Sequence, residues 1–174
     1  KAWPLGEEAK RVLVALTLGR MVHLSYGGRR TDRYGRALAH LHRADGLWIQ
    51  ERLLRLGMAR VYSFRDNRAV VGELLAAEAA ARTAKVGIWR HRWYRIWQQQ
   101  DLHPGLDGFF LIEGKVVNAA KVRGRIYLNF GQNWRQDFTI TVAPRDRRLF
   151  DKAGFNHTDI PGTINSPIRL PISV

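Results

Sequence analysis

Two short segments of the sequence combine arginines with aromatic residues, the residue types that bind a polyanion. The first is the run 31–36, Thr-Asp-Arg-Tyr-Gly-Arg, and the second is the run 89–97, Trp-Arg-His-Arg-Trp-Tyr-Arg-Ile-Trp. A guanidinium group donates paired hydrogen bonds to phosphate oxygens, and an aromatic ring can stack on a nucleobase. In the first segment the simpler interpretation is that Arg36 only forms a surface ion pair with Asp32. Taken by themselves, the residue types favour that interpretation.

The second segment carries tryptophans at a regular interval. Trp89, Trp93 and Trp97 recur every four residues, so in a helix they would form one stripe. Large aromatic residues usually pack against the rest of a protein. We therefore favour a stripe that docks this segment onto a neighbouring part of the chain. Base stacking by the tryptophans, with the intervening arginines on phosphates, is the alternative.

Other chemistries find little support in the sequence. His40 and His42 lie two residues apart on a predicted strand and share a face, but no third ligand is nearby. We interpret them as structural and predict no metal site. The chain has no cysteine, which excludes a thiolate nucleophile, a thiolate metal site and a disulfide scaffold. The Gly-x-Ser-x-Gly, Walker and His-Glu-x-x-His motifs are also absent.

The charge of the chain is strongly positive and unevenly distributed. Its 29 Lys and Arg against 15 Asp and Glu give a net charge of +14, of which residues 1–100 carry +11. Such an excess favours a polyanionic partner, most often nucleic acid. The alternative is a solubilising surface in an arginine-rich protein. The longest apolar run, residues 12–18, is too short to span a membrane.

Hydrophobic spacing and turn residues predict mixed helices and strands in the first half. Pro4 and the acidic pair after Gly6 favour a helix that stops near Gly19. Further predicted elements are strands at 21–26 and 37–42, a short strand leading into a helix over 47–56, and a helix over 70–85. The charged stretch 29–35 is a predicted loop, so Arg36 and its neighbours lie between two strands.

The second half is predicted to be mostly strands. Strands are expected at 109–117 with a kink at Gly114, at 125–130 and at 138–142, followed by a helix over 145–153 and a weak strand at 168–170. This order is that of an oligonucleotide-binding (OB) fold. We place domains at 1–97 and 108–174, joined by a linker at 98–107. A single barrel completed by both halves is the alternative.

The residues of the first half resemble the staphylococcal nuclease (thermonuclease) family. In that family an Asp-x-Tyr-Gly-Arg loop leads into a strand, and a following helix ends in Gly-x-Ala-x-Val. Here these motifs are Asp32–Arg36 and Gly57–Val61. Further matching positions are Gly6, Glu7, Glu8 and Ala9 upstream, and Glu78, Ala79, Ala81, Lys85, Gly87, Ile88 and Trp89 downstream. The second half is similar to the extra C-terminal domain of some bacterial members.

The resemblance implies a fold and a function. The implied fold is α+β with a β-barrel: a partial OB-fold domain with three helices, followed by a second small OB-like domain. The implied activity is calcium-dependent hydrolysis of phosphodiesters in DNA or RNA. Arg36 would clamp the scissile phosphate as a catalytic residue, and Tyr34 would bind a neighbouring phosphate. Since the family is often exported by bacteria, an extracytoplasmic location is also implied.

The sequence departs from the family pattern in one important respect. The family's Asp-Gly-Asp-Thr calcium strand, its other catalytic arginine and its general-base glutamate precede the first helix, and no Asp-Gly-Asp-Thr occurs here. Three of the five barrel strands precede that helix as well. We therefore expect the chain as it stands to lack the metal ligands and the base, and not to catalyse hydrolysis. The alternatives are a non-catalytic nucleic-acid-binding module and a protein-interaction or self-associating module.

Overall fold

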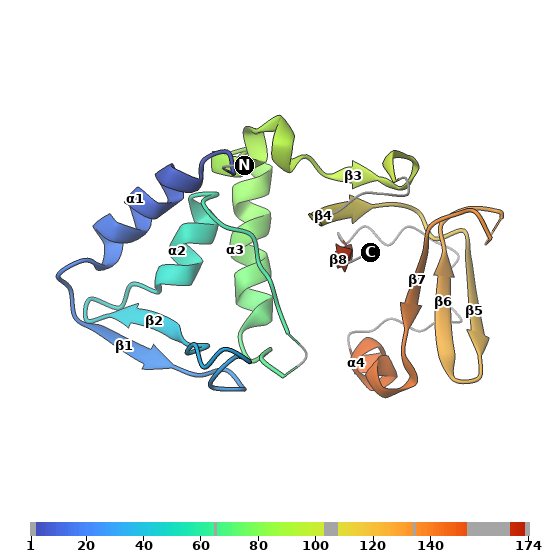
Figure 1. Cartoon of the computed structure of the whole chain (residues 1–174), viewed down its shortest axis with the longest axis horizontal. Coiled ribbons are helices and arrows are strands. Elements are labelled where there is room, and N and C mark those ends of the chain that lie inside the picture. Colours follow the sequence, from blue (N-terminus) through green and yellow to red (C-terminus); the bar gives the residue numbers. More distant parts are fainter. Residues whose placement is uncertain (1–2, 65, 103–107, 134, 153–167, 173–174) are drawn as a thin grey trace. The chain divides into compact units, whose positions relative to one another are not determined.

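The computed structural model describes residues 3–64, 66–102, 108–133, 135–152 and 168–172 (Figure 1). The chain divides into two compact units, Lys1–Arg95 and Ile96–Val174. Each sheet is formed by strands of one unit. The predicted linker, residues 98–107, overlaps the second unit: Gln98 ends a strand and Gln99–Asp101 form a 3-10 turn, while 103–107 lie outside the described residues.

The first unit begins with the predicted helix and hairpin. Helix α1 (Gly6–Thr17) has Glu7 and Glu8 in its first turn, where carboxylates favour the positive end of the helix dipole. Strands β1 (Val22–Ser25) and β2 (His40–Arg43) follow and pair antiparallel. The β1–β2 pairing is shorter than predicted. Beyond Ser25 and before His40, the backbone forms other hydrogen bonds, such as that from the Arg29 N–H to the Asp66 carbonyl.

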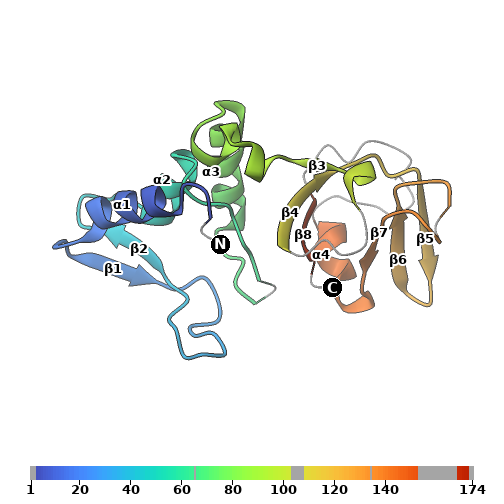
Figure 2. The ribbon, with the colours of Figure 1, turned by 45° about the horizontal axis from the view of Figure 1, so that its top comes forward.

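Two further helices complete the first unit. Helix α2 (Ile49–Arg55) is preceded by a single bridge between Trp48 and His42 in place of the predicted short strand. Helix α3 (Val71–Thr83) packs on α2, and α2 also contacts β2 (Figures 1 and 2). The core between them contains Leu54, Val61 and Ala77. The small alanine side chain on α3 lets the two helices approach closely.

The predicted barrel is not seen in the described residues. The first unit has a two-stranded sheet, and a barrel requires every strand to pair on both sides. We expected a partial OB-fold domain that lacks its first strands, and the described residues contain no closed barrel. What the structure does show is a mixed arrangement of helices and strands.

The arginine-tryptophan segment is not a continuous helix. Gly87–Arg90 (η1) and Arg92–Tyr94 (η2) are separate 3-10 turns, and Trp97 lies on the short strand β3 (Trp97–Gln98). The three tryptophans therefore do not form one helical stripe. Trp97 packs on Phe110 within the second unit, with ring centres 4.8 Å apart.

The second unit contains the predicted strands in two small sheets. Strands β4 (Gly108–Glu113) and β8 (Ile168–Ile172) pair antiparallel, with β3 on the other side of β4. Strands β5 (Asn118–Val122), β6 (Arg125–Asn129) and β7 (Thr139–Val142) form the other sheet. A 3-10 turn (Pro144–Asp146) leads into helix α4 (Arg147–Lys152).

The core of the second unit lies against the β5–β6–β7 sheet. Alternate residues of β6, Ile126 and Leu128, are buried together with Phe130, which follows this strand. The predicted long strand at 109–117 is interrupted after Glu113, so the chain changes sheets around Gly114. No sheet closes into a barrel in the described part of this unit.

Candidate nucleic-acid interface

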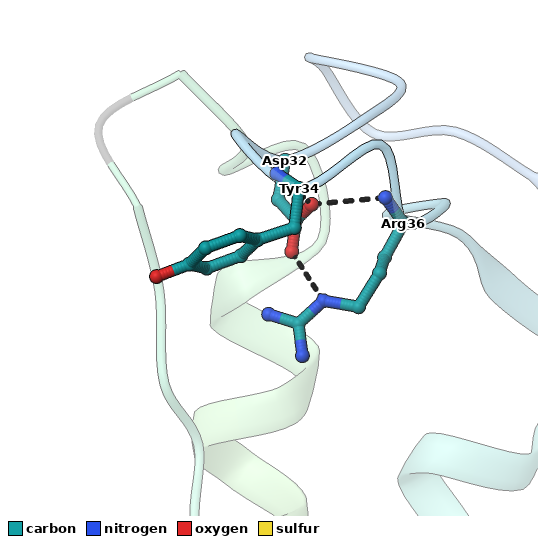
Figure 3. Close-up of polar contacts among 3 residues, drawn as sticks. All are labelled: Asp32, Tyr34 and Arg36. Atoms are coloured by element: carbon teal, nitrogen blue, oxygen red, sulfur yellow. Dashed lines mark hydrogen bonds and ion pairs between the residues drawn. The ribbon is translucent and has the colours of Figure 1, made fainter.

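The loop between β1 and β2 is organised by the carboxylate of Asp32. Its Oδ1 accepts hydrogen bonds from the backbone N–H groups of Tyr34 (2.8 Å) and Arg36 (2.9 Å) (Figure 3). The backbone N–H of Asp32 in turn donates to the carbonyl of Arg36 at 2.9 Å. An aspartate that caps its own turn in this way fixes the turn without a tertiary core. The loop is therefore a defined structure at the protein surface.

The same carboxylate also holds the Arg36 side chain. The Nε of Arg36 donates to Oδ2 of Asp32 at 2.6 Å, and the two terminal nitrogens of the guanidinium extend away from this contact (Figure 3). The Arg36 side chain is 75% exposed, whereas that of Asp32 is 17% exposed. The ion pair suggested by the sequence is therefore present. It uses one edge of the guanidinium, and Arg36 makes no other ion pair in the described part of the chain.

Aromatic and cationic groups cluster around this loop. Tyr34 is 66% exposed. The guanidinium carbons of Arg33 and Arg36 lie 4.8 Å and 5.2 Å from its ring centre. At the start of the loop, the guanidinium of Arg30 lies 4.9 Å from the ring of Tyr26. The structure thus brings the predicted site residues Tyr34 and Arg36 together on one exposed loop.

The pKa of Asp32 is lowered in this setting. Desolvation of the carboxyl acts to raise its pKa, but the hydrogen bonds from Arg36 and Tyr34 and the charge of Arg36 outweigh that effect. Asp32 is therefore a carboxylate at neutral pH. As an anion it keeps accepting from the loop's N–H groups and from Arg36.

A second loop lies beside the first and adds aromatic groups. The backbone N–H of Arg29 donates to the Asp66 carbonyl at 2.9 Å. Gly28 forms a bridge with Asn67. A Cβ at Gly28 would lie 2.1 Å from the Asp66 carbonyl oxygen, so only glycine permits this approach.

The second loop carries a pair of exposed aromatic residues, Tyr62 and Phe64. Their ring centres are 4.8 Å apart, and they are 54% and 46% exposed. The sequence assigned no role to the stretch 62–65, and residue 65 lies outside the described residues. In the sequence, the only indication of a role for this stretch is the spacing of Tyr62 and Phe64, two aromatic residues on either side of Ser63. Their position next to the first loop depends on tertiary contacts.

A cavity of about 350 Å³ lies between the stretch leading into β2, helices α2 and α3, and the 59–64 segment. Leu38, two residues after Arg36, lines this cavity together with Tyr62 and Phe64. Its lining is mainly apolar side chains. The exposed arginine loop is thus followed directly by a hollow that could receive a flat, apolar group.

The two histidines share a face of β2, as predicted. The Trp48 ring lies 5.3 Å from the ring of His40 and 5.8 Å from that of His42. Nε2 of His42 lies 3.1 Å from the Ser25 hydroxyl. Burial, together with the charge of His42, lowers the pKa of His40, whose Nδ1 is buried without a hydrogen-bond partner. This packing agrees with a structural role for the pair.

The described residues do not fit a calcium ion. Calcium takes six to eight oxygen ligands, several of them carboxylates. Within the described ranges, no three His, Asp or Glu side chains form a group that could hold a metal. Both carboxylate oxygens of Asp32 already accept hydrogen bonds from Tyr34 and Arg36.

Comparison with known proteins identifies the family of the chain. The model of the staphylococcal nuclease homologue family matches residues 1–91, which is more than half of the sequence. The chain therefore belongs to the staphylococcal nuclease family, as its motifs suggested.

Several named proteins are similar to this chain over about half of its length. The SPbeta prophage-derived endonuclease YokF and the endonuclease YncB, both of Bacillus subtilis (strain 168), are each 34% identical over 93 residues. A probable staphylococcal-like nuclease, CAN1 of Oryza sativa subsp. japonica, is 33% identical over 88 residues. The alignments cover 52%, 52% and 51% of this chain, but 31%, 44% and 25% of the relatives. The chain thus spans less than half the length of these relatives.

The search for membrane-spanning helices gave a negative result. Among the residues that the structure describes, every helix is too short or too polar to cross a bilayer.

Proposed function

We propose that the chain is part of a nuclease that hydrolyses phosphodiesters in DNA or RNA. Arg36 binds the scissile phosphate in this proposal, and Tyr34 binds a neighbouring phosphate. The main support for this proposal is the contact between Arg36 and Asp32. Nε of Arg36 donates to the Asp32 carboxylate, and the terminal nitrogens of the exposed guanidinium point outward. Membership of the staphylococcal nuclease family and similarity to two endonucleases support it.

The geometry suits binding and charge stabilisation. The terminal nitrogens of Arg36 can donate two hydrogen bonds to one phosphate, while Nε stays on Asp32. Negative charge that builds on the phosphate oxygens during cleavage would be stabilised by this preorganised donor. Tyr34 offers a hydroxyl on an exposed ring beside the same guanidinium. Arg36 and Tyr34 thus bind and orient the phosphate and stabilise its developing charge. The proposal does not assign the activation of water to either residue.

The cavity beside the loop suits the sugar or base of the same substrate. It begins two residues after Arg36 and is lined by Leu38, Tyr62 and Phe64. Apolar and aromatic walls accept the flat face of a base without reading its sequence. A substrate whose phosphate lies on Arg36 would place an adjacent nucleoside at this hollow.

The test compares cleavage and binding by the gene product that contains these residues. Labelled single-stranded DNA and RNA are incubated with it in calcium, and the Arg36→Ala and Arg36→Lys variants are assayed in parallel. Loss of a transition-state donor lowers the cleavage rate by about 100-fold. Lysine restores only part of that rate, because it lacks the planar fork. A folded protein that cuts neither DNA nor RNA, or an Arg36→Ala variant with full activity, would contradict the proposal.

A second candidate function is nucleic-acid binding without cleavage. The net charge of +11 in residues 1–100 and the arginine-tyrosine pairs of the loop favour it. This module would bind with an affinity that falls steeply with salt and leave the strand intact. A binding assay in chelator, run beside the cleavage assay, separates the two candidates.

We propose in addition that the second unit is OB-like. The order β4, β5, β6, β7, α4, β8 and the pairing of β4 with β8 support this assignment. Such folds frequently bind oligonucleotides, but the fold alone does not assign that role here.

A further inference from the structure

A second basic stretch lies far along the sequence from the Asp32–Arg36 loop. Residues 79–100 contain five Lys or Arg and no Asp or Glu. Four consecutive residues at its centre are exposed: Arg90, His91, Arg92 and Trp93. Trp93 is 53% exposed. We refer to Arg90, Arg92 and Trp93 as the Trp93 surface.

Two buried residues hold this surface in place. Ile88 is 5% exposed, and its backbone N–H donates to the Gly57 carbonyl at 2.9 Å. Tyr94 is 8% exposed, and its hydroxyl donates to the Pro4 carbonyl at 2.6 Å. Burial raises the pKa of Tyr94 despite the opposing charge of Arg60, whose guanidinium lies 5.4 Å from the ring. The hydroxyl therefore stays protonated and remains a donor at neutral pH.

Between these anchors the backbone forms two tight turns. The N–H of His91 donates to the Ile88 carbonyl at 3.0 Å, and that of Tyr94 donates to the His91 carbonyl at 2.9 Å. Nδ1 of His91 accepts from the N–H of Trp93 at 3.2 Å. Between the buried Ile88 and Tyr94, the four residues 90–93 are exposed, whereas Trp89 is half-buried. The Trp93 surface is thus preorganised, which lowers the entropy lost when a ligand binds.

The chemistry of the surface identifies a ligand class. The exposed indole of Trp93 offers a flat aromatic face on which a base can stack. Arg90 and Arg92 form no ion pair with any residue that the structure describes, so both charges are available to an anion. Two guanidinium groups that precede one exposed indole in the sequence combine the donors that bind phosphates with a ring that stacks on a base. The bases of a duplex are already stacked on one another, so an indole can stack only on an unpaired base.

We propose that the Trp93 surface binds single-stranded nucleic acid, with Trp93 stacked on a base and Arg90 and Arg92 on the flanking phosphates. This inference rests on the proposed function, because it extends the contact between the protein and the same substrate. The Trp93 surface is separate from the loop that holds Arg36. It therefore adds affinity for strands long enough to reach both places.

The experiment measures the binding of fluorescein-labelled oligonucleotides by anisotropy in EDTA, which prevents metal-dependent cleavage. The probes are oligo-dT of 6 and 20 nucleotides and a 20-base-pair duplex. The variants are Trp93→Ala, Trp93→Phe and the double variant Arg90→Ala/Arg92→Ala. The matched control is Arg11→Ala/Arg20→Ala, which removes two exposed arginines elsewhere in the same unit. Far-UV circular dichroism verifies that each variant is folded.

The expected results are specific to the single strand. Trp93→Ala weakens binding of the 20-nucleotide strand roughly tenfold, the loss of one stacked base, and leaves the duplex unchanged. Trp93→Phe retains most of the affinity because it keeps an aromatic ring. Arg90→Ala/Arg92→Ala lowers the slope of log affinity against log salt by about 1.4, the value for two phosphates of a single strand. The control pair changes this slope by less than half as much.

The outcomes separate this inference from the proposed function. Weaker binding by Arg36→Ala with unchanged binding by Trp93→Ala overturns the Trp93 surface and leaves the proposed function standing. The reverse pattern supports the Trp93 surface and contradicts the role of Arg36. If Trp93→Ala abolishes self-association in sedimentation experiments while single-strand binding is unchanged, the surface is a protein contact and the inference is wrong.

Discussion

The carboxylate of Glu78 on α3 accepts a hydrogen bond of 2.6 Å from the backbone N–H of Val61. Glu78 is 1% exposed and Val61 is 4% exposed, so this contact is buried. It joins the centre of α3 to the segment that leads from α2 to Tyr62 and Phe64. The position of the aromatic loop therefore depends on a carboxylate that faces away from solvent.

Glu78→Ala should destabilise the first unit. The substitution removes the Glu78 acceptor from the buried Val61 N–H, and losing one partner of a buried hydrogen bond costs about 1–3 kcal/mol. Urea unfolding followed at 222 nm measures this change, because the three long helices belong to the first unit. Glu73→Ala on the exposed face of the same helix is the control. Equal stability of the two variants would show that the buried contact contributes nothing.

Gly57→Ala should be more harmful than Gly46→Ala. Both glycines have positive φ, +64° and +84°, which costs a residue with a side chain about 1 kcal/mol. A Cβ at Gly57 would also lie 2.3 Å from the Val86 carbonyl oxygen, whereas a Cβ at Gly46 meets no atom within 4 Å. We expect losses of more than about 2 kcal/mol at Gly57 and about 1 kcal/mol at Gly46. Midpoints of thermal unfolding that coincide for the two variants would contradict this comparison.

Asp32→Ala should weaken binding at the Arg36 loop although it removes a negative charge. The carboxylate closes the turn through the N–H groups of Tyr34 and Arg36 and holds Nε of Arg36. Without the Asp32 carboxylate the Arg36 side chain is less ordered before binding. The entropy lost when a ligand fixes it lowers the affinity by about three- to tenfold. Anisotropy with the 6-nucleotide strand measures the effect, and Asp45→Ala on the neighbouring turn controls for charge. Tighter binding by Asp32→Ala would show that charge outweighs positioning.

The stability of the first unit should fall as the pH drops below about 6.5. Burial lowers the pKa of His40 in the fold, so the unfolded chain takes up a proton more readily than the folded chain. Above the pKa of histidine in the unfolded chain, about 6.5, His40 causes no loss of stability. As the pH falls below that value the free energy of unfolding decreases, until the pH reaches the lowered pKa of His40 in the folded chain. Urea titrations at pH 7.5 and 5.5 measure the loss. His40→Gln should reduce this pH dependence, and the exposed His23→Gln should retain it.

The sequence predicted local structure well wherever neighbouring residues decide it. The start of α1 follows from Gly6 and the two glutamates after it, and the helix ends before Gly19, as expected. The strands at 125–130 and 138–142 were also predicted, because alternating apolar residues such as Ile126 and Leu128 mark one buried face, whereas β5 was not predicted. Helical spacing was misleading at Trp89, Trp93 and Trp97, because the anchors Ile88 and Tyr94 impose tight turns instead.

The sequence by itself determined the family, through the Asp32–Arg36 and Gly57–Val61 motifs, and it identified Tyr34 and Arg36 as candidate site residues. These are patterns of residue type and spacing, which a chain carries whether or not it is folded. The sequence also suggested the Asp32–Arg36 ion pair, but only the structure shows that this pair leaves the terminal nitrogens of the guanidinium directed outward (Figure 3). It also decided that Tyr62 and Phe64 lie beside that loop and that Trp93 faces outward. The positions of Tyr62, Phe64 and Trp93 depend on contacts between residues far apart in sequence, whose packing no local pattern records.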